Sequence, residues 1–408
     1  MSKLIDRLLR NNASLFIIVF GAVSFFITNI LMKEILSSRK YGEYSILITY
    51  FSVVYLLGIL GAEQGFLRYS KRINTNVIAT HKSQLNLLVV ISICTSIVFC
   101  LLFKYFYNEI EINTFLLFTS TISMVIMLFL FNILRLNENF IASQLFSNYW
   151  KNTLLVLAVV FFIWRNTNLT LFVNILSVNI ILITVIALFF VKTKLKFVYI
   201  SEINTKEICI SAFHFSLAIF AITLIIFSDR FIIERKHNIE EFGNYFYLTN
   251  FFLAPFSILQ NYIGFKQLII FKTNFSFEYF KAINKKVLLL GFFISLILFS
   301  LSFIIDYLNI VKFDFNKYVI IIIILLITGI VRLYSSAILS AFEAKTNIRT
   351  LRNSNIYIIS ATIGVISFIL IFVTKLEFIL VFFIIIWLFR SIIHKKLLMK
   401  QLKNNSDL

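Results

Sequence analysis

The sequence predicts an all-α polytopic membrane protein with about twelve transmembrane helices in two six-helix lobes. Composition is the first observation behind this prediction. Of the 408 residues, 60% are hydrophobic and only 14% are charged, whereas a soluble domain has about 45–50% apolar and about 25% charged residues. The chain has 10 Gly and 1 Pro, and its long unbroken apolar runs favour helices over the alternating strands of a β-barrel.

The lengths of the apolar runs are the second observation, because a helix needs about 20 apolar residues to cross a bilayer. We expect twelve spans, at roughly 13–35, 44–61, 85–103, 114–135, 145–164, 170–191, 210–233, 244–264, 287–305, 318–340, 354–374 and 377–394. The basic start of the chain precedes the first run, and no small-residue cleavage site follows that run. We therefore expect an uncleaved first span.

The distribution of charge predicts the orientation. With the N-terminus placed in the cytoplasm, 27 of the 38 Lys and Arg residues and 8 of the 19 Asp and Glu residues fall on the cytoplasmic side. The whole net charge of +19 then lies on that side, in agreement with the positive-inside rule. We expect both termini in the cytoplasm, and we expect no nucleic-acid partner despite the basic composition.

An internal repeat is the third observation. The polar connection from Lys192 to Glu207 divides the chain into lobes of residues 1–197 and 198–408. Six is an even number of spans, so the two lobes share one orientation and form a parallel repeat. A shift of 201 positions places Tyr41-Gly42-Glu43-Tyr44 on Phe242-Gly243-Asn244-Tyr245 and Thr28-Asn29 on Asp229-Arg230. The second copy thus has a charged pair that the first copy lacks.

Three short motifs resemble those of polysaccharide-unit flippases, the Wzx-type exporters of O-antigen or capsule repeats. These exporters belong to the superfamily that includes the multidrug (MATE) exporters and the peptidoglycan-precursor flippase. The motifs are Tyr41-Gly42-Glu43-Tyr44, Gly61-Ala62-Glu63-Gln64-Gly65 with Arg68-Tyr69, and Ser228-Asp229-Arg230-Phe231-Ile232-Ile233 leading to Glu241-Phe242-Gly243-Asn244-Tyr245. The resemblance implies two pseudo-symmetric lobes around a central cavity. It also implies that the protein flips an undecaprenyl-diphosphate-linked oligosaccharide to the outer leaflet of a bacterial inner membrane by alternating access.

The same resemblance implies a transporter and not an enzyme, with no cofactor. Its expected partners are the lipid-linked oligosaccharide, membrane lipids, the polysaccharide polymerase and the chain-length regulator. Coupling to protons, to Na⁺ or to the membrane potential alone stays open, as does the identity of the sugar.

Charged residues inside the apolar runs are the first candidate site residues, because each costs about 2.5–3.5 kcal/mol at a helix centre and usually faces protein or water. Asp229 and Arg230 are adjacent and do not face each other. In the functional interpretation, Arg230 binds the diphosphate and Asp229 tunes it or binds a coupling cation. The alternative is a structural pair near the outer interface.

Arg332 lies in the tenth predicted span with no acidic residue nearby in the sequence. An arginine there suits bidentate contact with phosphate oxygens, and the alternative is that it snorkels to the inner interface. Lys151, Asn148 and Asn152 lie within about one turn of one another. They predict a polar patch that faces the cavity, unless the fifth span begins only after Asn152.

Glu63 and Arg68 flank the inner end of the second predicted span. They are candidates for a cytoplasmic gate, and a solvated loop is the alternative.

Two other functions remain open at this point. A cation-coupled multidrug exporter of the same superfamily would favour acidic residues in its cavity. A membrane polysaccharide polymerase or acyltransferase would need acid and base groups near the lipid interface, usually on a long outer loop, and the longest outer loop expected here has only about a dozen residues.

Overall fold

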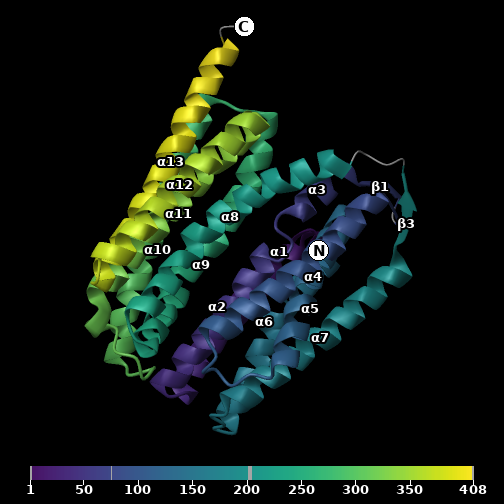
Figure 1. Ribbon diagram of the computed structural model, residues 1–408. Coiled ribbons are helices and arrows are strands. Elements are labelled where there is room, and N and C mark those ends of the chain that lie inside the picture. The colour runs from purple at the N-terminus through teal and green to yellow at the C-terminus, as the bar shows by residue number, and fades with distance from the viewer. Residues whose placement is uncertain (1, 75, 201–204, 407–408) are drawn as a thin grey trace. The chain divides into compact units, whose positions relative to one another are not determined.

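The computed structural model describes residues 2–74, 76–200 and 205–406, and most of these residues are helical (Figure 1). Within these ranges twelve helices have at least 20 residues, one for each predicted span, and α3 is a shorter thirteenth. Eleven helical stretches of the described chain are long and apolar enough to cross a membrane. The prediction of an all-α polytopic membrane protein is confirmed.

The chain separates into two compact units, Met1–Thr223 and Leu224–Leu408. The first unit contains α1 (Ser2–Ile35), α2 (Ser38–Leu57), α3 (Ala62–Tyr69), β1 (Lys71–Asn74), β2 (Val77–Thr80), α4 (Lys82–Phe106), α5 (Thr114–Leu136), α6 (Phe140–Ile163), α7 (Leu169–Lys194) and β3 (Lys196–Tyr199). The boundary falls inside α8 (Thr205–Lys236). The second unit continues with α9 (Ile239–Thr273), α10 (Phe277–Tyr307), the 3₁₀ turn η1 (Asn316–Tyr318), α11 (Val319–Lys345), α12 (Ile348–Phe372) and α13 (Leu376–Ser406). The division at 197/198 into two six-helix lobes, and the central cavity, stay predictions.

The predicted repeat recurs in the helix ends of each unit. α1 ends at Ile35 and α8 ends at Lys236, 201 positions later, and the starts of α2 and α9 have the same spacing. Both turns use the same cap: Ser37 Oγ accepts a hydrogen bond from the Lys40 amide, and Asn238 Oδ1 accepts one from the Glu241 amide. A polar side chain at this position satisfies one of the unpaired amides at a helix start. The shared cap and spacing support a duplication.

The eighth predicted span, 244–264, lies in α9, which has 35 residues but is not among the eleven apolar stretches. Four successive residues, Tyr245 to Leu248, are each at most 2% exposed. Successive residues on a helix point in different directions, so protein surrounds α9 on all sides at this level. Such a helix can carry polar side chains without presenting them to lipid.

A small sheet is the part of the fold that the sequence did not predict. β1 pairs with β2 in antiparallel orientation, and β2 pairs with β3 in parallel orientation with Ile78 opposite Phe197. The polar connection Lys192 to Glu207 was expected to be a linker, but Lys192 and Lys194 lie in the last turn of α7 and the next residues form β3. The branched and aromatic residues of β2 and β3 are typical of strands.

The second predicted span, 44–61, is shorter in the structure and followed by a bend. α2 ends at Leu57, and Gly61 has a φ of 75° before α3 begins. Glycine adopts this left-handed conformation at little cost. A Cβ atom at Gly61 would also lie 2.8 Å from backbone atoms of Phe215 and Ser216 in α8. Both the positive φ and the lack of space at this position therefore require glycine.

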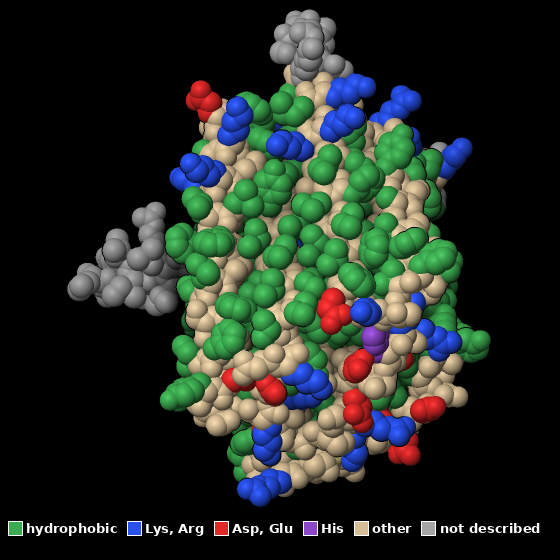
Figure 2. Space-filling view, turned by 90° about the vertical axis from the view of Figure 1, so that its left-hand side faces the viewer, with side chains coloured by type: hydrophobic (Ala, Val, Ile, Leu, Met, Phe, Trp, Pro, Cys, Tyr) green, Lys and Arg blue, Asp and Glu red, His purple; other side chains and the backbone are tan. Residues whose placement is uncertain are grey.

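The outer surfaces of the helices match a lipid environment. α10 exposes the large apolar side chains Leu288, Leu289, Leu290, Phe292, Phe293, Leu296 and Ile297. Figure 2 shows hydrophobic side chains across the middle of one face, basic side chains near its upper end, and acidic and basic side chains mixed near its lower end. An apolar band between two polar ends is what a bilayer requires.

Gly329→Ala should lower the thermal stability of the protein. A Cβ atom at Gly329 in α11 would lie 2.5–2.7 Å from ring atoms of Phe256 in α9, and overpacking of this kind costs about 1–3 kcal/mol. Thermal unfolding of the purified protein in detergent measures the effect. Gly364→Ala in α12 is the matched control, because no atom lies within 4 Å of the added methyl group. Equal losses in the two variants would contradict the close contact between α9 and α11.

Candidate functional site

The second unit contains a cluster of charged residues inside its helices, and Asp229 is its acidic member. Asp229 lies in α8 and is partly buried. Its Oδ2 atom accepts a hydrogen bond from the hydroxyl of Tyr245 in α9, and its Oδ1 atom accepts one from the backbone amide of Arg230 at 2.8 Å. Tyr245 lies where the repeat places the counterpart of Tyr44, on the first turns of the helix after the shared cap.

Arg230 is held differently from its neighbour. Its guanidinium carbon lies 5.2 Å from the ring centroids of Phe227 and of Phe246. A cation at this distance from an aromatic face is attracted by the ring quadrupole, so both rings stabilise the charge inside the protein. The guanidinium also interacts electrostatically with Asp229, although the two side chains were not expected to face each other.

Arg332 joins this cluster from α11. Its Nε atom donates to Gln260 Oε1 at 3.3 Å, and its Nη2 atom donates to Ser257 Oγ at 3.2 Å. Both partners are neutral and both lie in α9. The hydrogen bonds hold the guanidinium inside the bundle, in contrast to the snorkelling alternative.

Arg230 and Arg332 bring two positive charges close to the Asp229 carboxylate. The charges of Arg230 and Arg332 both act on the Asp229 carboxylate, although Arg332 has no acidic residue near it in the sequence. Two guanidinium groups and one carboxylate therefore share one region of α8, α9 and α11. All three side chains are partly buried.

Arg390 and Trp387 of α13 are site residues that the sequence analysis missed. The Trp387 ring centroid lies 5.4 Å from the guanidinium carbon of Arg332 and 5.4 Å from that of Arg390. Arg390 is only 7% exposed, and the carboxylate of Glu343 acts on it electrostatically. The sequence did contain an indication of this site, because Arg390 is a charged residue inside the last apolar run, as Arg332 is in the tenth.

Lys151, Asn148 and Asn152 form a polar patch in the first unit. Helix α6 begins at Phe140, so all three residues lie within the helix, and the start of the membrane span along it stays a prediction. Lys151 Nζ donates to Asn148 Oδ1 at 3.1 Å, and Asn148 Nδ2 donates to the Gln144 carbonyl oxygen at 3.1 Å. Among the residues that the structure describes, no carboxylate lies within ion-pair distance of Lys151.

The close packing of α1 on α6 fixes this patch. A Cβ atom at Gly21 of α1 would lie 2.7 Å from Asn148 Oδ1, so the absence of a side chain there makes room for the amide. Asn148 is only 4% exposed, and Lys151 and Asn152 are partly buried. Lys151 is thus a partly buried cation that donates to a neutral group.

Glu63 and Arg68 do not form a pair. Both lie in the short helix α3, where Glu63 is 4% exposed and Arg68 is exposed. Glu63 Oε1 accepts a hydrogen bond from Gln64 Nε2 at 3.4 Å, and a carboxylate in a first helical turn is favoured by the helix dipole. The solvated-loop alternative is wrong for Glu63, and the gate remains a prediction.

The described side chains were also compared with what a metal site requires. Within the described ranges, no group of three or more His, Cys, Asp and Glu side chains is placed to hold a metal ion.

Tyr245→Phe should destabilise the protein, because it removes the hydrogen bond that the Tyr245 hydroxyl donates to the Asp229 carboxylate. Hydrogen bonds to charged groups contribute about 1.5–3 kcal/mol, so we expect a loss of that size in the free energy of unfolding, measured with denaturant in mixed micelles. Tyr44→Phe is the matched control at the equivalent position. The Tyr44 hydroxyl is buried and has no hydrogen-bond partner among the described residues, so its removal should cost nothing. A loss from Tyr44→Phe as large as that from Tyr245→Phe would contradict the role of Asp229.

Comparisons with protein-family models, with curated proteins and with solved structures found no match. The membrane-spanning helical fold rests on the structure itself. The resemblance to polysaccharide-unit flippases stays a prediction from short motifs.

Proposed function

We propose that this protein moves a lipid-linked oligosaccharide with a diphosphate linkage across a bacterial inner membrane. The observation that carries the proposal is the charge cluster of the second unit, in which two guanidinium groups accompany one carboxylate inside a bundle of membrane-spanning helices. A buried charge is costly unless another charge or a polar network compensates it. Guanidinium groups inside the helices are therefore suitable partners for an anionic ligand, and Arg332 donates its hydrogen bonds to neutral groups only.

A diphosphate suits this cluster because of the geometry of arginine. The planar guanidinium donates two parallel hydrogen bonds to a phosphate or carboxylate group. Arg332 donates to the neutral Gln260 and Ser257, and phosphate oxygens would be stronger acceptors than either. Lys151 adds a second buried cation with a neutral partner in the first unit.

The charge distribution supports an N-terminus in the cytoplasm, because this orientation places 27 of the 38 Lys and Arg residues on the cytoplasmic side. Export then moves the diphosphate from the negative to the positive side of the membrane. Moving about two negative charges across 100 mV releases about 4.6 kcal/mol. The membrane potential therefore favours export, and coupling to protons or Na⁺ stays open.

Of the other functions, a cation-coupled drug exporter fits the cluster less well, because a cationic drug would meet the two guanidinium groups of Arg230 and Arg332. A membrane polymerase or acyltransferase would need acid and base groups near the lipid interface. The cluster described here lies within the helices instead.

Deletion of the gene in its host tests the proposal directly. Leaflet-specific labelling of the sugar should show the lipid-linked unit accumulating on the cytoplasmic leaflet, with surface polysaccharide lost. Units that reach the outer leaflet without being polymerised would support the polymerase instead. Normal polysaccharide together with increased drug sensitivity would support the drug exporter.

Arg332→Gln and Arg230→Gln should each reduce export by about tenfold or more, since a hydrogen bond to a charged group contributes about 1.5–3 kcal/mol. The double variant should abolish export while the protein is still inserted at normal abundance. Arg332→Lys keeps the charge but loses the bidentate geometry, so it should fall between Gln and the native residue. Export is measured as outer-leaflet sugar label, with Arg349→Gln on the exposed start of α12 as the control. Retained export in the double variant would contradict the proposal.

A further inference from the structure

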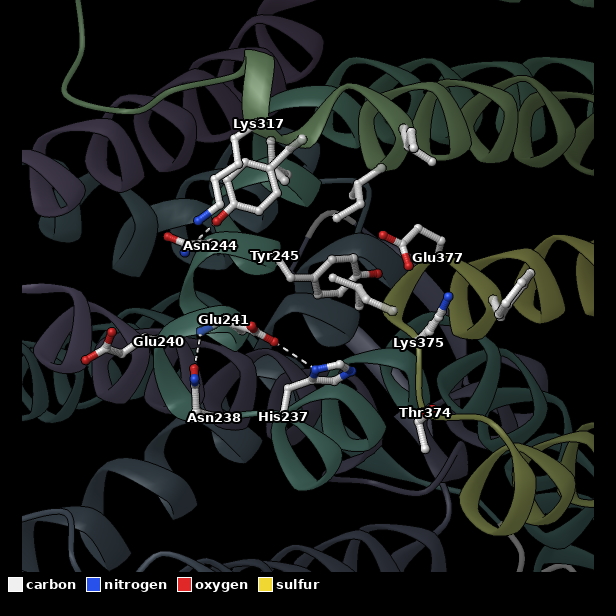
Figure 3. Close-up of a pocket in the computed structure, with 16 residues that line it drawn as sticks. His237, Asn238, Glu240, Glu241, Asn244, Tyr245, Lys317, Thr374, Lys375 and Glu377 are labelled. Atoms are coloured by element: carbon white, nitrogen blue, oxygen red, sulfur yellow. Dashed lines mark hydrogen bonds and ion pairs between the residues drawn. The ribbon is translucent and has the colours of Figure 1, made fainter.

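The second unit contains a cavity of about 970 Å³ at one end of its bundle (Figure 3). It lies where the α8–α9 turn, the start of α11 and the α12–α13 turn meet. Its polar lining consists of His237, Asn238, Glu240, Glu241, Asn244, Tyr245, Lys317, Tyr318, Thr374, Lys375 and Glu377. This volume is typical of a binding pocket for an organic ligand.

Several lining groups are fixed by contacts within the cavity wall. His237 Nδ1 lies 2.7 Å from a carboxylate oxygen of Glu241, and Asn244 Nδ2 donates to the Tyr318 hydroxyl at 2.9 Å. The Tyr318 ring also stacks on Phe313, with 5.3 Å between centroids. Side chains held in this way lose little entropy when a ligand binds.

Other lining groups are available to a ligand. In the described part of the chain, the side chains of Glu240, Lys375 and Glu377 have no hydrogen-bond or ion-pair partner, and the buried Nε2 atom of His237 has none either. Figure 3 shows the polar ends of Tyr245, Lys375 and Glu377 pointing into the same region. The cavity thus combines a fixed wall with unused donors and acceptors.

The first unit has an equivalent cavity, which provides an internal comparison. It lies between the α1–α2, α4–α5 and α6–α7 connections and has a volume of about 460 Å³. The repeat relates the two linings. Three residues of the smaller cavity have counterparts in the larger cavity 201 positions later: Lys40 and Glu241, Glu43 and Asn244, and Leu47 and Leu248. Lys40 Nζ donates to the Thr167 carbonyl oxygen at 3.1 Å and so bridges the smaller cavity. No such bridge is possible from Glu241.

The composition of the larger cavity indicates the class of its ligand. Three carboxylates face two ammonium groups, so neither a diphosphate nor a multivalent cation would find its charge compensated. Carboxylates, amides and ammonium groups together offer both acceptors and donors to hydroxyl groups. The rings of Tyr245, Tyr318 and Phe378 add apolar surface. These features fit a neutral polyhydroxylated molecule.

We propose that this cavity binds the sugar portion of the transported molecule. The source of the sugar rests on the proposed function, whereas the class of ligand rests on the cavity itself. Tyr245 lines the cavity and also donates to Asp229, so a sugar in the cavity contacts the side chain that holds the buried carboxylate. The sugar and the diphosphate would thus be bound by two sites that share one residue.

The test uses the full chain in lipid nanodiscs and the free oligosaccharide of the host's surface polysaccharide, without lipid or phosphate. Isothermal titration calorimetry should show saturable binding, which Tyr318→Ala and Glu377→Gln should each weaken by at least tenfold. Glu43→Gln in the smaller cavity is the matched control and should leave binding unchanged. The thermal midpoints of all variants are compared with that of the native protein, so that a loss caused by misfolding is recognised.

Absence of saturable binding would overturn the proposal. So would an equal loss in the Glu43→Gln variant, or unchanged binding in both Tyr318→Ala and Glu377→Gln when these are folded. The Arg332→Gln variant separates the two proposals, because it should bind the free oligosaccharide normally while export is reduced. If export survives in the Arg230 and Arg332 double variant, the proposed function fails, and the binding data still decide the cavity.

Discussion

The burial of the Asp229, Arg230 and Arg332 charges is the constraint on which the second unit depends. Moving an ion out of water costs several kcal/mol even after the protein relaxes. Three of the groups that offset this cost, the Tyr245 hydroxyl, Ser257 Oγ and Gln260 Oε1, come from one helix, α9. These polar groups suit the turns of α9 around Tyr245, where protein surrounds the helix.

The two units share a capped turn and a buried tyrosine, but they differ in the residue that lies at the position of Thr28 or Asp229. Each unit turns between two long helices on a capped residue, and each buries a tyrosine two turns later, Tyr44 or Tyr245. In the first unit, Thr28 hydrogen-bonds to its own helix through the Ser24 carbonyl oxygen. In the second, the equivalent residue is Asp229, which binds Tyr245. Small changes at equivalent positions have therefore converted a packing arrangement into a charged site.

The sequence was sufficient to predict the helices and the candidate charges. Apolar runs of bilayer length specify helices because backbone groups in lipid must bond within the segment, and each of the twelve predicted runs corresponds to one long helix. The intramembrane charges were conspicuous for the same reason, since each is costly in lipid. Arg390 gave the same signal, but it lies near the end of its run, where basic residues commonly anchor a helix to the interface.

The contacts between helices could not be predicted. Arg332 and its partner Gln260 are 72 positions apart, and no local pattern relates them. The sheet was missed because strands of four residues are too short to show a period of two. The lining of the larger cavity likewise comes from three separate connections, each of which resembles an ordinary polar loop.

The parallel pairing of β2 with β3 has a consequence for the order in which the protein is made. The two strands are separated by α4, α5, α6 and α7, so they meet only after all four helices have been synthesised. β3 precedes α8, and the pairing is complete at Tyr199, before any residue of the charge cluster has left the ribosome. The start of α4 and the end of α7 can therefore be held together by backbone hydrogen bonds between β2 and β3 while the chain is still growing. The costly insertion of Asp229 and Arg230 then follows this pairing in the order of synthesis.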